Sequence, residues 1–238
     1  YPDNPVGNRF LSTFLEEKIS LAAIVMESQS RASLRKRLKK KIGKDGWNAT
    51  ARRLMEVSML RLRRKRIGDI AGKNGIPVHE VPKFNGPECA ALLGELDADL
   101  LVIASAPILS EEIFTRCRIG CLNAHPGWLP AFRGLGANAY ALQQGKSAGI
   151  TVHWIDRGVD TGPIIAREEV PVRRGDTVAR INDRAVNRGA EMLARVIRQI
   201  EADRLTMADV DEPQGINYKA MPYAEVRELN RKLKKEWR

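Results

Sequence analysis

Three side chains with complementary chemistry lie in two Gly- and Pro-rich stretches of the chain, Asn123 and His125 in LNAHPGWLP and Asp160 in DRGVDTGP. Asn123 and His125 are two residues apart at the end of an expected strand, so their side chains project from one face. Amide and imidazole N–H groups can hold the oxyanion of a tetrahedral intermediate. A carboxylate can raise the imidazole's pKa or accept a proton from an amine. The set therefore suits acyl transfer, although the spacing of Asn-x-His alone also fits a structural role.

The pattern of apolar segments predicts how the chain positions these groups. Strands are expected at residues 21–26, 76–82, 99–106 and 118–125, and helices at 89–96, at 110–117 and around Phe10–Leu15, where apolar residues recur at helical spacing. This alternation is typical of a mostly parallel, doubly wound α/β sheet. Residues 150–156 and 163–172 are expected to extend the sheet in antiparallel fashion, and a long helix is expected over 177–200. Because Pro126 ends a strand, Asn123 and His125 lie at the carboxyl edge, where such sheets bind ligands.

The net charge of +11 comes from one segment. Residues 31–66 hold fifteen Lys and Arg against two acids, which makes the segment +13 and the remainder −2. Leu34, Leu38 and Ile42 recur every four positions, and a second helix is expected from about residue 48 to 71, so 31–71 is expected to be a basic helical hairpin. The hairpin is either a solvated surface or a binding site for an anionic partner such as RNA, lipid head groups or an acidic protein. With Trp47 as its single aromatic residue, base stacking gains little support.

Composition excludes several other classes of protein. The chain is 43% hydrophobic and 29% charged, has no run approaching the ~18 apolar residues of a membrane span, and does not open like a signal peptide. Three cysteines without a CxxC pair argue against a disulfide framework or structural zinc, so a cytoplasmic protein is expected. No metal site is expected, because no histidines are closely spaced. The domains are expected to be 1–202, with the hairpin inserted, and a C-terminal tail, 203–238.

Two longer segments resemble a known family. LNAHPGWLPAFRG, followed by GITVHWIDRGVDTGPIIAREEVPVRRGDT, is similar to the folate-dependent formyltransferases. That family includes glycinamide ribonucleotide, methionyl-tRNA and amino-sugar N-formyltransferases and formyltetrahydrofolate hydrolase. The shared pattern is Asn-x-His-Pro, Leu-Pro with a Gly, Thr-x-His, then Asp-x-Gly-x-Asp-x-Gly. The chain matches every element in order, within residues 76–200.

The resemblance implies a Rossmann-like fold, a formyltransferase activity and 10-formyltetrahydrofolate as the donor. It implies a catalytic trio of Asn123, His125 and Asp160. It further implies a donor pocket formed by Pro107, Ile108, Leu109, Asp156, Val159 and Asp160. His153 matches the family's second histidine and is expected to support the Asp160 loop.

The acceptor implied by the resemblance is a primary amine, which we expect to belong to an amino sugar, a nucleotide sugar or another specialised metabolite. Candidate acceptor-binding residues are Gly7 and Asn8, in an expected loop before the first helix, and Arg133. The opening PDNPVGN lacks the Gly/Ser-rich phosphate cradle of purine-pathway relatives. The methionyl-tRNA enzymes add a C-terminal domain of roughly a hundred residues, whereas 36 residues follow Ala202 here.

Other readings remain open. The same trio directing water at the formyl group would make a formyltetrahydrofolate hydrolase. Gly134-x-Gly136-x-x-Ala139, with Asp156 about twenty residues later, fits a loose dinucleotide-binding fingerprint, but a Pro-containing loop is expected before it rather than a strand. A nucleic-acid-binding module using residues 31–66 would show a steep salt dependence.

Overall fold

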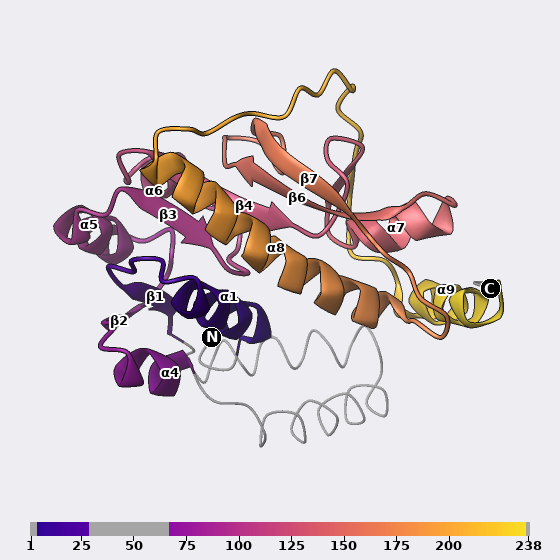
Figure 1. Ribbon diagram of the computed structural model, residues 1–238, viewed down its shortest axis with the longest axis horizontal. Coiled ribbons are helices and arrows are strands. Elements are labelled where there is room, and N and C mark those ends of the chain that lie inside the picture. Colours follow the sequence, from indigo (N-terminus) through magenta and orange to yellow (C-terminus); the bar gives the residue numbers. More distant parts are fainter. Residues whose placement is uncertain (1–3, 29–66, 237–238) are drawn as a thin grey trace.

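The computed structural model describes residues 4–28 and 67–236 (Figure 1). Its strands are β1 (Ile24–Glu27), β2 (Val78–Val81), β3 (Leu100–Ile103), β4 (Gly120–His125), β5 (Phe132–Gly134), β6 (Ala148–Trp154), β7 (Ile164–Val170) and β8 (Ile216–Tyr218). Its helices are α1 (Pro5–Glu16), α4 (Ile67–Lys73), α5 (Pro87–Leu96), α6 (Glu111–Phe114), α7 (Ala137–Gln143), α8 (Val178–Glu201) and α9 (Tyr223–Glu236). Three of these elements, the strands β5 and β8 and the helix α7, lie where no regular structure was expected from the sequence.

The sheet has the predicted mixture of parallel and antiparallel strands. β3 and β4 run parallel, and β6 and β7 follow antiparallel in the order β3-β4-β6-β7. β1 and β2 form a second parallel pair. The fold is therefore Rossmann-like α/β with an antiparallel extension, as the sequence predicted.

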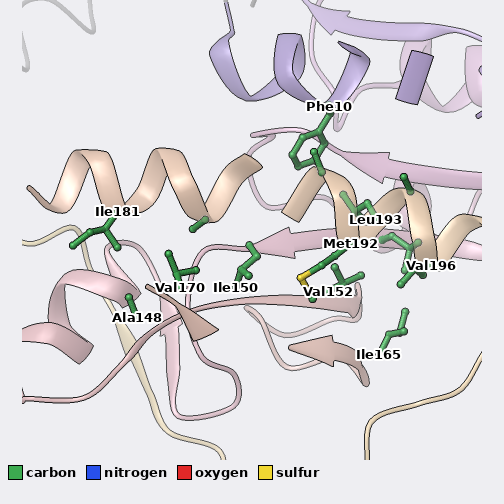
Figure 2. Packing of buried hydrophobic residues seen from close by; sticks show 14 of the residues in the cluster. Phe10, Ala148, Ile150, Val152, Ile165, Val170, Ile181, Met192, Leu193 and Val196 are labelled. Carbon is green, nitrogen blue, oxygen red and sulfur yellow. The ribbon is translucent and has the colours of Figure 1, made fainter. Parts of the chain in front are cut away.

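Helix α8 covers one face of the larger sheet, and α1 packs against α8. α8 begins at its N-cap Thr177, whose side chain accepts a hydrogen bond from the Arg180 N–H. The apolar stripe of α8 includes the fully buried Leu193 and packs on Ile150 of β6, while Phe10 of α1 lies on the far side of α8 (Figure 2). α8 carries Gly189 where a Cβ atom would lie 3.0 Å from side chains of β4 and β6. The helix can therefore lie close over the strand that ends in His125.

A second apolar cluster lies under α5. Cys89 and Leu93 of this helix pack with Val81 of β2 and with partly buried side chains of β1 and β3. The continuous apolar run at residues 99–106 is typical of a strand covered on both faces. The four residues of β3 are instead each half-buried, because β3 is an edge strand of its sheet among the described residues.

The basic hairpin predicted over 31–71 lies largely outside the described residues. Residues 67–71 form the beginning of α4, in agreement with the predicted second helix. The tail predicted after residue 202 crosses the end of the sheet and ends in α9, which is drawn in yellow beside α7 (Figure 1). No helix in residues 4–28 and 67–236 combines the length and apolar character needed to cross a membrane.

Candidate active site

The structure brings Asn123, His125 and Asp160 together. β4 supplies the first two, and its antiparallel register with β6 sets His153 opposite Asn123. Asp160 comes from the loop between β6 and β7, and its Oδ2 lies 3.3 Å from His125 Nδ1. His125 is 4% exposed and the Asp160 side chain 14% exposed. An imidazole and a carboxylate thus meet in a site largely shielded from water.

The loop that carries Asp160 is shaped by its own residues. Asp156 accepts hydrogen bonds from the Gly158 N–H at 3.0 Å and from the Thr161 hydroxyl at 2.6 Å. A side chain at Gly162 would collide with the Trp154 carbonyl oxygen. Asp160 itself has a φ of 53°, in the left-handed region that Asp tolerates better than most residues. The Asp156 carboxylate therefore holds the turn that aims Asp160 at His125.

Both ring nitrogens of His125 face oxygen atoms. Nε2 lies 3.1 Å from the Phe132 carbonyl oxygen, which can only accept, so Nε2 carries a proton and donates it. Nδ1 faces Asp160, so a second proton is shared between imidazole and carboxylate whenever this contact is a hydrogen bond. Burial lowers the pKa of His125, against the opposing effects of the Asp160 charge and the Phe132 carbonyl.

His153, like His125, is held by a backbone carbonyl, but its other ring nitrogen contacts Asn123. Its Nδ1 lies 2.8 Å from the Trp154 carbonyl oxygen and donates to it, which leaves Nε2 free to accept from the Asn123 amide at 3.2 Å. Asp160 Oδ1 is farther from Nε2, at 3.8 Å. Burial, and then the proximity of His125, lower the pKa of His153. His153 thus orients Asn123 directly and contacts the Asp160 loop less closely than we expected.

Strand β5 adds two backbone groups that sequence reasoning missed. The Gly134 N–H donates to Asp160 Oδ2 at 2.8 Å, beside the Phe132 carbonyl that holds His125. Gly134 has a φ of +80°, which favours glycine. The Gly-x-Gly of the sequence is the signal that could have found this strand end, because it marks a close approach of the backbone.

The residues expected to bind the donor lie on two neighbouring loops. Pro107 and Ile108 are exposed, Ile108 by 70%, and Leu109 packs against the cluster under α5. Asn85, which the sequence did not single out, ties this loop by donating to the Ile108 carbonyl at 2.9 Å and accepting from the Ser110 N–H at 2.8 Å.

An ion pair connects this loop to the one that carries Asp156, Val159 and Asp160. Arg157 Nη2 lies 2.6 Å from Glu111 Oε1, where α6 begins directly after the first loop. Val159 is half-buried. The two segments assigned to the donor therefore lie near each other, with an exposed apolar side chain, Ile108, on one of them.

The candidate acceptor residues are placed differently from expectation. Gly7 and Asn8 lie in the first turn of α1 and not in a loop, because Asn4 caps the helix and Pro5 begins it. The Asn8 N–H donates to the Asn4 carbonyl at 2.9 Å and is used within the helix. Arg133 donates through Nε to the Gly215 carbonyl at 3.1 Å and so contacts the tail.

Two alternatives can be compared with the structure. Contrary to expectation, the residues before Gly134 are in a strand, and Gly134 is itself the last residue of this strand, β5. This strand lies outside the larger sheet, and β6 runs antiparallel to β4, so no parallel βαβ unit surrounds the fingerprint. Among residues 4–28 and 67–236, no group of three or more His, Cys, Asp and Glu side chains is arranged to hold a metal ion.

Comparison with known proteins identifies the family. The formyl transferase family model matches residues 15–197. The chain belongs to the formyl transferase family. Its members are enzymes that use 10-formyltetrahydrofolate as the formyl donor.

Individual formyltransferases match different shares of the chain. The methionyl-tRNA formyltransferase of Syntrophus aciditrophicus (strain SB) is 34% identical over 129 residues, which cover 53% of this chain and 41% of that protein. The chain spans about half the length, or less, of the curated relatives it matches. The structure of glycinamide ribonucleotide transformylase 1 from Symbiobacterium toebii superimposes with a TM-score of 0.60 at 25% identity, covering 90% of this chain and 89% of that one. The formyltransferase PseJ from Anoxybacillus kamchatkensis, solved with a UDP-linked formamido sugar and tetrahydrofolate, has a TM-score of 0.50 at 22% identity, covering 72% of this chain and 87% of that one, and shares the fold.

Proposed function

We propose that this protein transfers a formyl group from 10-formyltetrahydrofolate to a primary amine. One observation carries the proposal: an amide, an imidazole and a carboxylate from two separate stretches meet at the end of β4, with His125 Nδ1 3.3 Å from Asp160. These groups supply a hydrogen-bond donor for an oxyanion and a pair that can take up a proton, as acyl transfer to an amine requires.

Asn123 is the group we assign to the oxyanion. One N–H of its amide is held by His153 Nε2, which fixes the plane of the amide and leaves the other N–H to donate to the formyl oxygen. The amine nitrogen forms a bond to the formyl carbon, and the carbonyl electron pair moves onto the oxygen. A donor already in place lowers this barrier because it needs no reorganisation when the charge develops.

His125 and Asp160 are the groups we assign to proton transfer. The attacking amine loses a proton as its bond to carbon forms, and the folate nitrogen must gain one as its own bond to carbon breaks. The His125–Asp160 pair accepts the first proton and returns one to the departing nitrogen, so tetrahydrofolate and a formamide result. Because His125 Nε2 is held by the Phe132 carbonyl, Asp160 is the member of the pair placed to exchange protons with substrate.

For donor binding we propose the two loops with Pro107, Ile108 and Leu109 on one side and Asp156, Val159 and Asp160 on the other. The exposed Ile108 supports this assignment, because an apolar side chain on a loop that the Arg157–Glu111 ion pair ties to the Asp160 loop suits the flat face of a pteridine. Asp156 acts there through the turn that it holds, since its carboxylate is engaged by Gly158 and Thr161.

For the acceptor we propose a small amine, with an amino sugar or nucleotide sugar as the preferred class. We further propose residues 1–202 as the catalytic domain. A second candidate acceptor is methionyl-tRNA, since a relative 34% identical over 129 residues carries that name. The basic segment 31–66 provides +13 of charge that an RNA could use, and it lies outside the described residues.

The test is an acceptor screen with the purified protein. We would supply 10-formyltetrahydrofolate with amino sugars, nucleotide-linked amino sugars, glycinamide ribonucleotide or methionyl-tRNA, and follow tetrahydrofolate formation. A sugar amine that is formylated supports the preferred class, and formylation of methionyl-tRNA supports the second candidate. Formate released at the same rate without any amine would identify a hydrolase and refute the proposal.

A further inference from the structure

Strand β5 forms hydrogen bonds on both of its edges. One edge contacts His125 and Asp160, and the other pairs with β8 of the tail. Phe132 and Gly134, two residues apart, direct a carbonyl oxygen and an N–H to His125 and Asp160. The register of β5 with β8 places the tail on the other edge, with Phe132 opposite Ile216 and Gly134 opposite Tyr218. The catalytic pair thus occupies the position that a neighbouring strand would take in a sheet.

The tail is attached to this edge by bonds of its own. The Leu135 N–H donates to the Tyr218 carbonyl at 2.8 Å, and the Gly215 N–H donates to the Pro130 carbonyl at 2.9 Å. Arg133 Nε also donates to the Gly215 carbonyl. The backbone on either side of β5 is therefore fixed by residues that follow α8 by more than ten positions.

Tyr218 carries the side-chain part of this attachment. Its ring stacks on Tyr140 of α7 with centroids 4.2 Å apart, and on Phe132 of β5 at 5.9 Å. Gln144 donates to its hydroxyl at 3.0 Å. Stacked aromatic pairs add stability beyond the area they bury. Tyr218 is thus wedged between α7 and the strand that holds the catalytic groups.

A second attachment holds the tail before it reaches β8. Arg167 of β7 lies over the Trp128 ring at 4.4 Å and donates to the Leu129 carbonyl at 2.9 Å, while its other nitrogen contacts Glu212 at 2.7 Å. The loop that leads into β5 and the tail that leads into β8 are therefore joined to the same side chain. Neither can shift without disturbing this arginine.

We infer that the tail strand β8 positions the catalytic pair, with Tyr218 as the positioning residue. The inference rests on the proposed function of His125 and Asp160. Its physical basis is that a three-residue strand has too few bonds to hold its place alone, so the register set by Tyr218 determines where the Phe132 carbonyl and the Gly134 N–H lie. A misplacement of about 1 Å at such groups can cost about a hundredfold in rate.

The first test compares Tyr218→Ala with Tyr218→Phe and Tyr223→Ala. Tyr218→Phe keeps the stack, and Tyr223 is an exposed tyrosine at the start of α9 that serves as a matched control. We expect Tyr218→Ala to lose between about tenfold and a hundredfold in kcat, with the KM for the donor changed by less than about threefold. The pH at which its kcat is half-maximal should also move, because the contacts of the His125–Asp160 pair have changed. Tyr218→Phe and Tyr223→Ala should keep both the wild-type kcat and the pH profile.

A folded Tyr218→Ala protein with the kcat and pH profile of Tyr223→Ala would overturn the inference. If Tyr218→Ala does not fold, Tyr218→Leu keeps an apolar contact with Phe132 without the stack and is expected to show the same loss.

A second test uses the wild-type protein and needs no substrate. The amides of Leu135 and Gly134 lie next to each other but donate to the tail and to Asp160 respectively. If the tail positions β5, both amides open together and show hydrogen-exchange protection within about tenfold of each other. A Gly134 amide that stays protected well beyond Leu135 would mean that the tail detaches without affecting the site. Hydrogen exchange does not depend on whether an amine acceptor is found. Failure of the inference can therefore be distinguished from failure of the proposed function.

Discussion

Replacing Asp160 by Asn removes the negative charge of this carboxylate and keeps the shape of the side chain. Asn also tolerates the left-handed φ of 53° at this position, and its carbonyl oxygen can still accept the Gly134 N–H that Asp160 Oδ2 accepts at 2.8 Å. Backbone and hydrogen bonding are thus retained, and the negative charge beside His125 is lost. The change therefore tests electrostatics rather than folding.

The size of the effect follows from the separation of the two groups. A full charge pair 3.3 Å apart is worth about 5 kcal/mol at an effective dielectric constant of about 20. Removal of a single preorganised electrostatic contact in characterised enzymes costs about 3 to 4 kcal/mol. We therefore expect kcat to fall by about a thousandfold, with little change in KM, since the charge acts mainly as protons move.

The assay follows tetrahydrofolate formation with the acceptor that the screen selects. Asp203→Asn is the matched control, because Asp203 also has a positive φ, is exposed and lies after α8. Circular dichroism and thermal unfolding would verify that each variant folds. A folded Asp160→Asn protein that retains more than about a tenth of wild-type kcat would refute the role assigned to this carboxylate.

Three further predictions follow from burial and contacts. Asn123→Ala removes the proposed oxyanion donor, so steady-state kinetics should show a kcat lower by about a hundredfold or more. Burial lowers the pKa of His125 and of His153 in the folded protein below the ordinary histidine value of 6.5. Below pH 6.5 these histidines therefore bind protons more readily in the unfolded chain than in the folded protein. The free energy of unfolding should therefore be level above pH 6.5 and fall as the pH decreases below it, by up to about 1.4 kcal/mol per unit for each histidine; urea titrations that show no such slope would contradict this. Leu193→Ala in the core should cost about 2 to 5 kcal/mol in the same titrations, whereas the exposed Leu135→Ala should change stability by less than about 0.5 kcal/mol.

The sequence by itself determined which local structures form and where the reactive groups lie along them. Apolar runs and helix caps are local properties, so the strand ending at His125 and the helix beginning at Thr177 could be predicted within a few residues. The period of two along a strand placed Asn123 and His125 on one face. Asp160, thirty-five residues away, was a candidate by its side-chain chemistry and its Gly- and Pro-rich loop, and the family motif then assigned it to the same site, which no local pattern could have done.

Tertiary structure alone decided how these groups are held. β5 and β8 have three residues each, too short for a periodic pattern, and they form because they pair with each other across more than eighty residues. The partner of His153, the tautomer of His125 and the backbone N–H on Asp160 depend on that long-range packing. Gly7 and Asn8 are a different case: they are helical because Asn4 and Pro5 start α1, which is a local signal, and tertiary structure adds the hydrogen bond from the Asn4 side chain to the distant Ala104 carbonyl. Sequence thus named the reactive groups, and contacts between remote segments fixed their orientation, because hydrogen bonds across such separations leave no periodic signal along the chain.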